Sequence, residues 1–208
     1  MTEKEAEELC RMIRIGVDLS KPEYTYHPKT RRELKDLIEE LIKERGNEAD
    51  LNDIDVFQIT DMNHLFENSK FNGDISRWNV SRVKYMSGMF NHSQFNGDIS
   101  NWDVRNVEGM AWMFENSKFN GDISNWNVSK VGNMSFMFHA SKFNGDISNW
   151  DVSGVVSMLE MFACSKFNGD ISNWNVSKVE NMSGIFRDSE FKGDISKWSI
   201  IKPGLILV

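Results

Sequence analysis

The sequence predicts an α/β repeat protein, a solenoid with one short parallel strand and one short helix in each 24-residue coil. Three observations lead to this prediction. The phrase FNGDIS-x-W begins at residue 71 and returns every 24 residues, ending as FKGDISKW at 191. Eight positions in each 24 are apolar in almost every copy. Within one unit, the spacing of the apolar residues changes from alternation, typical of a strand, to helical spacing.

Residues 1–50 lie outside the repeats and are expected to form an N-terminal helical cap. Its best-marked helix begins at a capping box of Thr30 and Glu33 and ends at Gly46. One face of this helix is apolar, so it must pack against another part of the protein, and the first end of the repeat array is available. The apolar face consists of Leu34, Leu37, Ile38, Leu41 and Ile42.

Residues 51–198 are expected to form the solenoid, with about six repeats. Phe71, Gly73 and Ile75 alternate along the chain and predict a strand. From Val83 to Phe90 the apolar residues are spaced i, i+3, i+6, i+7, which predicts a short helix with one buried face. A single unit cannot cover its own apolar side, whereas a stack of units can.

Residues that recur 24 positions apart are called a column here, and several columns are aromatic or methionine throughout. Each coil would meet its copy roughly 5 Å away, so like side chains pack on like side chains. A register kept to the residue is then required, because one inserted residue would turn every inward side chain outward. Two of these columns are Phe71, Phe95, Phe119, Phe143, Phe167 and Phe191, and Trp78, Trp102, Trp126, Trp150, Trp174 and Trp198.

The unit S-x-F-N-G-D-I-S-x-W-[ND]-V-S-x-V-x-x-M-x-x-M-F resembles the repeat of the BspA-like leucine-rich-repeat bacterial surface proteins, over about residues 51–198. The resemblance implies a right-handed solenoid with parallel strands on one side and short helices on the other. It also implies adhesion or host interaction at the cell surface. The chain shows no signal peptide and no lipid or cell-wall anchor, so the sequence leaves surface and cytoplasmic locations open.

Composition and charge exclude several classes of protein. Hydrophobic residues make up 40% of the chain and charged residues 26%, which is typical of a folded protein. No stretch approaches the ~18 apolar residues of a membrane-spanning helix. The net charge of −7 argues against a nucleic-acid partner, because phosphate binding needs clustered Lys and Arg.

Two of the repeated columns could bind a ligand, and each also has a structural interpretation. The aspartate column could form a row of calcium sites, although we expect its carboxylates to accept backbone N–H bonds in their own turns. The tryptophan column could stack on sugars, although Trp78 shares one side of a strand with Val80 and is expected in the core. The aspartates are Asp74, Asp98, Asp122, Asp146, Asp170 and Asp194.

A protein-binding surface is expected where columns vary, because a partner's surface is irregular. The column of Gly88 varies, and it places Trp112 and Phe136 on adjacent coils, with Tyr85 and Leu159 nearby. An exposed aromatic pair among polar neighbours is a candidate binding site for a host or own-cell protein. The alternative is that the pair only covers the junction between two coils.

The sequence predicts no enzyme and no cofactor, because the four histidines share no column and no catalytic motif is present. We therefore expect a non-catalytic protein-interaction or adhesion module. The alternatives are an intracellular scaffold of the same fold, and a calcium- or carbohydrate-binding module that uses the Asp or Trp columns. Residues 199–208 are expected to close the last coil; otherwise the apolar residues 205–208 would favour an end-to-end homodimer.

Overall fold

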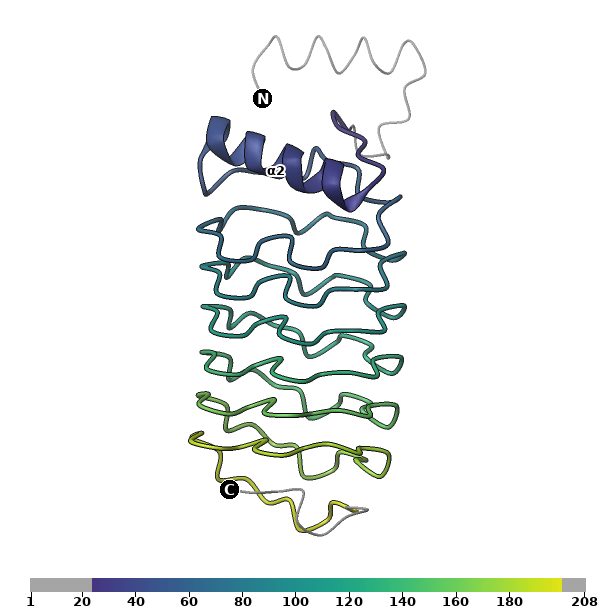
Figure 1. Ribbon diagram of the computed structural model, residues 1–208, viewed down its shortest axis with the longest axis vertical. Helices are drawn as coiled ribbons and strands as arrows, with labels where there is room; N and C mark the ends of the chain where they lie inside the picture. Colours follow the sequence, from purple (N-terminus) through teal and green to yellow (C-terminus); the bar gives the residue numbers. More distant parts are fainter. Residues whose placement is uncertain (1–23, 200–208) are drawn as a thin grey trace, which may run out of the picture.

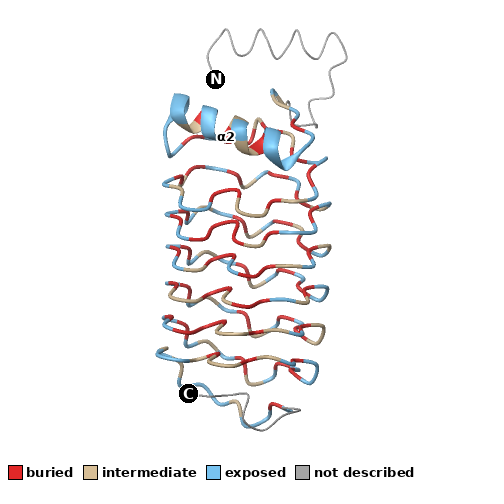
Figure 2. Cartoon of the chain, in the orientation of Figure 1, coloured by how far each residue is buried: buried red, intermediate tan, exposed pale blue. Residues whose placement is uncertain are grey.

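A computed structural model describes residues 24–199, which form a column of stacked coils with one helix across the first end (Figure 1). Each coil takes 24 residues, so the predicted repeat architecture is present. Buried residues recur at the same places in successive coils (Figure 2). The part of the predicted cap before residue 24, the closing segment after residue 199 and the proposed dimer edge at 205–208 lie outside the described residues.

Helix α2 (Arg31–Arg45) forms where the capping signals predicted it. The hydroxyl of Thr30 accepts the backbone N–H of Glu33, and the Glu33 carboxylate accepts the N–H of Lys29 at 2.8 Å. At the other end, Gly46 has a φ of 90° and its N–H donates to the carbonyl of Ile42. Both helix ends therefore have partners for backbone groups that the helix itself leaves free.

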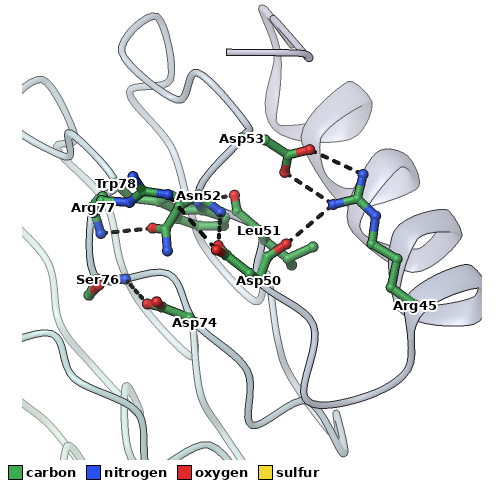
Figure 3. Close-up of polar contacts among 9 residues, drawn as sticks. All are labelled: Arg45, Asp50, Leu51, Asn52, Asp53, Asp74, Ser76, Arg77 and Trp78. Carbon is green, nitrogen blue, oxygen red and sulfur yellow. Dashed lines mark hydrogen bonds and ion pairs between the residues drawn. The ribbon is translucent and has the colours of Figure 1, made fainter. Parts of the chain in front are cut away.

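The apolar face of α2 packs on the first coil and continues the core of the stack. Leu34, Ile38 and Leu41 are buried in the same cluster as the coil residues. Polar side chains of the helix fix its position, because Arg45 pairs with Asp53 at 3.1 Å and donates to the carbonyl of Asp50 (Figure 3).

Arg31 in α2 also satisfies a backbone group at the open end of the stack. Its guanidinium donates to the carbonyl of Asn63 at 2.9 Å. In the next coil the equivalent carbonyl, that of Ser87, accepts the N–H of His64. The helix thus replaces a hydrogen bond that a preceding coil would make.

The predicted short helix of each coil is absent, and α2 is the one α-helix among the described residues. The stretch from Val83 to Phe90 and its copies form consecutive tight turns instead. Gly88 within this stretch, His92 two residues after it, and the copies of both in the other coils have φ between 47° and 63°, in the left-handed region. A right-handed helix needs a φ near −63° at every residue, so the two structures are incompatible.

Hydrogen bonding between coils explains why turns form here. In one coil, alternate N–H groups donate to carbonyls of the next coil over 2.8–3.0 Å, and N–H groups between them donate three residues back within the coil. In a helix all of these N–H groups would donate to carbonyls of the same helix, and none would be left to bond the next coil. The groups that donate onward from this coil belong to Met86, Gly88, Phe90 and His92.

The predicted strand of each coil is likewise absent as a regular element in the described part of the chain, where isolated parallel bridges take its place. The longest row of bridges has one residue per coil and passes through Tyr85 rather than through the Phe-x-Gly-x-Ile segment. In the Phe-x-Gly-x-Ile segment, Asp50 and Asp74 form the one bridge. Before the helix, Tyr26 forms a parallel bridge with Ile54.

The core consists of aromatic and methionine columns stacked along the long axis. Phe66 stacks on Phe90 with ring centroids 5.6 Å apart, and Phe71 stacks on Phe95 at 6.2 Å. Within a coil, Phe90 and Phe95 also stack, at 4.4 Å. Each fully buried large side chain contributes about 1.5–3 kcal/mol, so coil stacking supplies the stability that a single coil lacks.

Candidate functional site

The turns place two columns of left-handed residues on the surface of the stack, four positions apart in each coil. This conformation costs most non-glycine residues roughly 1–2 kcal/mol, although Asn and Asp adopt it more readily. We call the first column the Gly88 column; it consists of His64, Gly88, Trp112, Phe136, Glu160 and Gly184. The second consists of Asn68, His92, Asn116, Ala140, Cys164 and Asp188.

Trp112 and Phe136 lie in the middle of the Gly88 column, each with a φ of 57°. Their rings stack with centroids 5.9 Å apart and planes 8° apart. Trp112 remains 39% exposed and Phe136 is half-buried. The structure therefore brings the two predicted residues together on the surface, at positions where glycine would adopt the backbone conformation without strain.

Tyr85 and Leu159, the other two predicted site residues, lie on the coils to either side of the aromatic pair. Tyr85 is 44% exposed and belongs to the row of parallel bridges, where it pairs with Gly109. Leu159 is half-buried, and its carbonyl accepts the N–H of Phe136 at 2.8 Å. Leu159 thus helps to hold the backbone of the pair.

Charged residues beside the pair form a network that the sequence did not reveal. The rings of His139 and Phe136 pack edge to face, with centroids 5.7 Å apart and planes 71° apart. The two ring nitrogens of His139 lie 3.4 Å from a carboxylate oxygen of Glu115 and 3.6 Å from one of Glu160. Glu160 also pairs with Arg187. These side chains, only 20–23% exposed apart from that of Arg187, give the aromatic pair a polar, partly buried surround.

Comparison with known families adds the identity of the repeat. A family model described as "Mycoplasma protein of unknown function, DUF285" matches residues 35–142 and again residues 115–203. The chain belongs to this family. No curated protein and no solved structure matches it. The two overlapping matches together span residues 35–203, so the family sequence extends from helix α2 through the whole stack of coils.

In the DUF285 chain each aspartate of the repeated column closes its own turn, as the structural interpretation predicted. The carboxylate of Asp122 accepts the N–H of Ser124 at 2.9 Å, and its copies do the same over 2.8–2.9 Å. This N–H, followed by the serine hydroxyl, lowers the pKa of Asp122 below its ordinary value. Between residues 24 and 199, His, Cys, Asp and Glu side chains nowhere gather in threes around a position suited to a metal ion.

The tryptophan column is core, and the idea that its rings stack on sugars is wrong. The indoles of Trp78 to Trp198 are 3–6% exposed, so they present no flat face to a ligand. Each indole N–H donates to a carbonyl of the preceding coil over 2.9–3.2 Å, as Trp78 does to Leu51 (Figure 3). A buried indole needs such a partner, because an unpaired N–H in the core is costly.

Helix α2 is too short and too polar to cross a bilayer, and the described residues contain no other α-helix.

Proposed function

We propose that this protein is a non-catalytic protein-interaction or adhesion module built on a right-handed, leucine-rich-repeat-like solenoid of the BspA-like kind. In this proposal residues 1–50 cap the first coil, residues 51–198 form the array, and residues 199–208 close it. Membership in a repeat family and the column of coils support this reading. No catalytic role is assigned, since the described histidines share neither a column nor a metal-ligand arrangement.

The single observation that carries the proposal is the presence of Trp112 and Phe136 at left-handed positions. Gly88 and Gly184 occupy equivalent positions in other coils, where glycine meets the backbone requirement at no steric cost. Stacking of the pair contributes about 0.5–1.5 kcal/mol beyond burial and offsets part of the backbone cost. The part of Trp112 that stays exposed gains no burial energy on folding, and strained residues cluster at binding sites.

The partner is proposed to be another protein that inserts an apolar or arginine side chain against the Trp112–Phe136 pair. Tryptophan is enriched among the residues that dominate binding energy, and an exposed indole offers both apolar area and a face for a cation. Tyr85 and Leu159 would form the edge of this contact.

The proposal is tested by comparing proteins retained from host and own-cell lysates by the wild type and by Trp112→Gly/Phe136→Gly. The double variant is expected to fold, because glycine suits both positions, and to lose the partner. A matched control, Asn68→Gly/Asp188→Gly, changes two left-handed residues in the first and last coils and should keep the partner. Retention of the same proteins by wild type and double variant would overturn the proposal.

The origin of the retained protein decides between adhesion and an intracellular scaffold of the same fold. A host protein, together with digestion of this protein by protease added to intact cells, supports adhesion. An own-cell protein, together with resistance to added protease, supports the scaffold.

A further inference from the structure

Two equivalent open grooves lie side by side on the part of the coil that contains the S-N-W-[ND]-V segment. One is lined by residues 124–129 and, from the next coil, by Asn149 and Asp151; its volume is about 360 Å³. The other is lined by residues 100–105 and, from the next coil, by Asn125 and Asn127. The second lining is the first moved back by 24 residues, so the grooves repeat along the stack.

The side chains that separate these grooves have unused hydrogen-bonding groups. Asn125 lines both grooves and is exposed, and its side-chain amide has no hydrogen-bond partner within residues 24–199. The same holds for Asn149 and for Asn101. By contrast, the amide oxygen of Asn120, in another asparagine column, accepts the N–H of Asn144 at 2.7 Å.

The repetition of asparagine at this position has no explanation in the packing of the coils. The exposed column of Lys84 varies freely, with Glu108 and Val156 in later coils. The column that contains Asn125 is constant over four consecutive coils, although three of its side chains make no hydrogen bond in the described structure and Asn173 accepts one only from Lys197 of the last coil, at 3.3 Å. Its members are Asn101, Asn125, Asn149 and Asn173.

We propose that these grooves bind a neutral, linear oligosaccharide that runs along the stack across successive coils. Each asparagine amide offers two donors and an acceptor, which suits the adjacent hydroxyl groups of a sugar. The larger groove contains amides and hydroxyls and one carboxylate, that of Asp151, which already accepts the N–H of Ser153. The lining of the larger groove lacks a cationic side chain, and the one cation of the other groove, Arg105, is paired with Asp103, so a polyanion is disfavoured.

This site is independent of the surface around Trp112 and of the buried tryptophan column. Trp126 and Val128 are 4% and 1% exposed and serve only as the floor of the larger groove. The ligand would be held by the asparagine amides rather than by stacking on the indoles.

Arg105 distinguishes the two grooves. It takes the place that Ser129 has in the larger groove, and its Nε donates to Asp103 at 2.7 Å. The groove that contains Arg105 has a volume of about 230 Å³. Arg105→Ser should widen this groove and extend the sugar-binding surface by one coil.

The test is a titration of the full chain with neutral hexasaccharides of glucose, mannose and N-acetylglucosamine, followed by NMR of the asparagine side-chain amides. We expect saturable shifts of the Asn125 and Asn149 signals with at least one of the three sugars. Asn125→Ala and Asn149→Ala should each weaken binding about 2- to 13-fold, the range for one lost hydrogen bond. Arg105→Ser should strengthen it.

Controls separate this site from the proposed protein-binding surface. Trp112→Gly should bind the sugar as the wild type does, and a sulfated hexasaccharide should not compete. Unchanged thermal unfolding of the asparagine variants shows that any loss of binding is local. The proposal would be overturned if none of the three sugars shifted the signals, or if Asn125→Ala and Asn149→Ala bound the sugar as tightly as the wild type. A preference for the sulfated sugar would also overturn it.

Discussion

The indole of Trp112 lies almost parallel to the ring of Phe136, 5.9 Å away between centroids, and both residues have a φ of 57°. The same two residues therefore form the aromatic surface and require the left-handed backbone. That backbone exists because alternate N–H groups of the turns donate to the next coil. Surface chemistry and coil stacking are therefore coupled at this position.

Substitutions at Trp112 should distinguish a turn from a helix. At a left-handed position, Trp112→Gly should be more stable than Trp112→Ala by about 1–2 kcal/mol, because alanine carries a Cβ that this conformation disfavours. In a helix the order would be reversed, since glycine costs roughly 1 kcal/mol relative to alanine. Urea unfolding of the two variants, measured side by side, gives the order, and greater stability of the alanine variant would contradict the turn structure.

Gly121 should not tolerate alanine. A Cβ at this position would lie 2.9 Å from Cε2 and 3.0 Å from Cζ of Phe119, a ring that is fully buried and stacked on both sides. Because the ring cannot move away, we expect Gly121→Ala to lower the free energy of unfolding by about 1–3 kcal/mol. Gly132→Ala is the control: its Cβ would have no neighbour within 4 Å, so stability should be unchanged or increase by up to about 1 kcal/mol. Equal effects of the two substitutions would argue against this packing.

Removal of one indole hydrogen bond should destabilise the stack. Trp126 is 4% exposed and donates to the carbonyl of Ile99 at 3.1 Å. Trp126→Phe removes one of the two donors to that carbonyl, which also accepts the N–H of Trp102 at 3.2 Å, so we expect a loss of about 0.5–1.5 kcal/mol in chemical denaturation. Trp112→Phe, at an exposed position, should change stability by less than about 0.5 kcal/mol. A neutral Trp126→Phe would show that the indole N–H is not needed.

The aspartate column should make stability fall in acid. The backbone N–H of the following serine, then its hydroxyl, lowers the pKa of Asp98 and Asp146 below the ordinary value of 3.8. A depressed folded-state pKa contributes stability that is present above 3.8 and is lost as the pH falls through the lower folded value. The melting temperature should therefore drop between about pH 5 and pH 2.

An asparagine substitution provides the control for this pH dependence. Asn79 already accepts the N–H of Ser81 in an equivalent turn, so an amide oxygen can replace the carboxylate. Asp98→Asn/Asp146→Asn should keep the stability of the wild type near neutral pH and show a smaller drop in acid. An unchanged acid profile would show that these two carboxylates do not contribute to it.

The 24-residue register, the residues of the core and the position of helix α2 could all be predicted from the amino-acid sequence. Identical side chains such as Phe71 and Phe95 stack wherever a strict period brings successive coils together, so period alone predicts the contact. For the same reason the neighbours Trp112 and Phe136 could be predicted. The caps of α2 are local, within four residues, and need no knowledge of the rest of the chain.

The backbone conformation between the core positions could not be predicted, because it depends on hydrogen bonds between coils. Val83, Met86, Met89 and Phe90 are buried in tight turns, as they would be on one face of a helix, so their spacing could not distinguish the two. The turn is selected because its N–H groups find acceptors in the next coil, a contact between residues 23 positions apart that no local pattern encodes. The His139 contacts with Glu115 and Glu160 depend in turn on that backbone, since it sets where each side chain emerges.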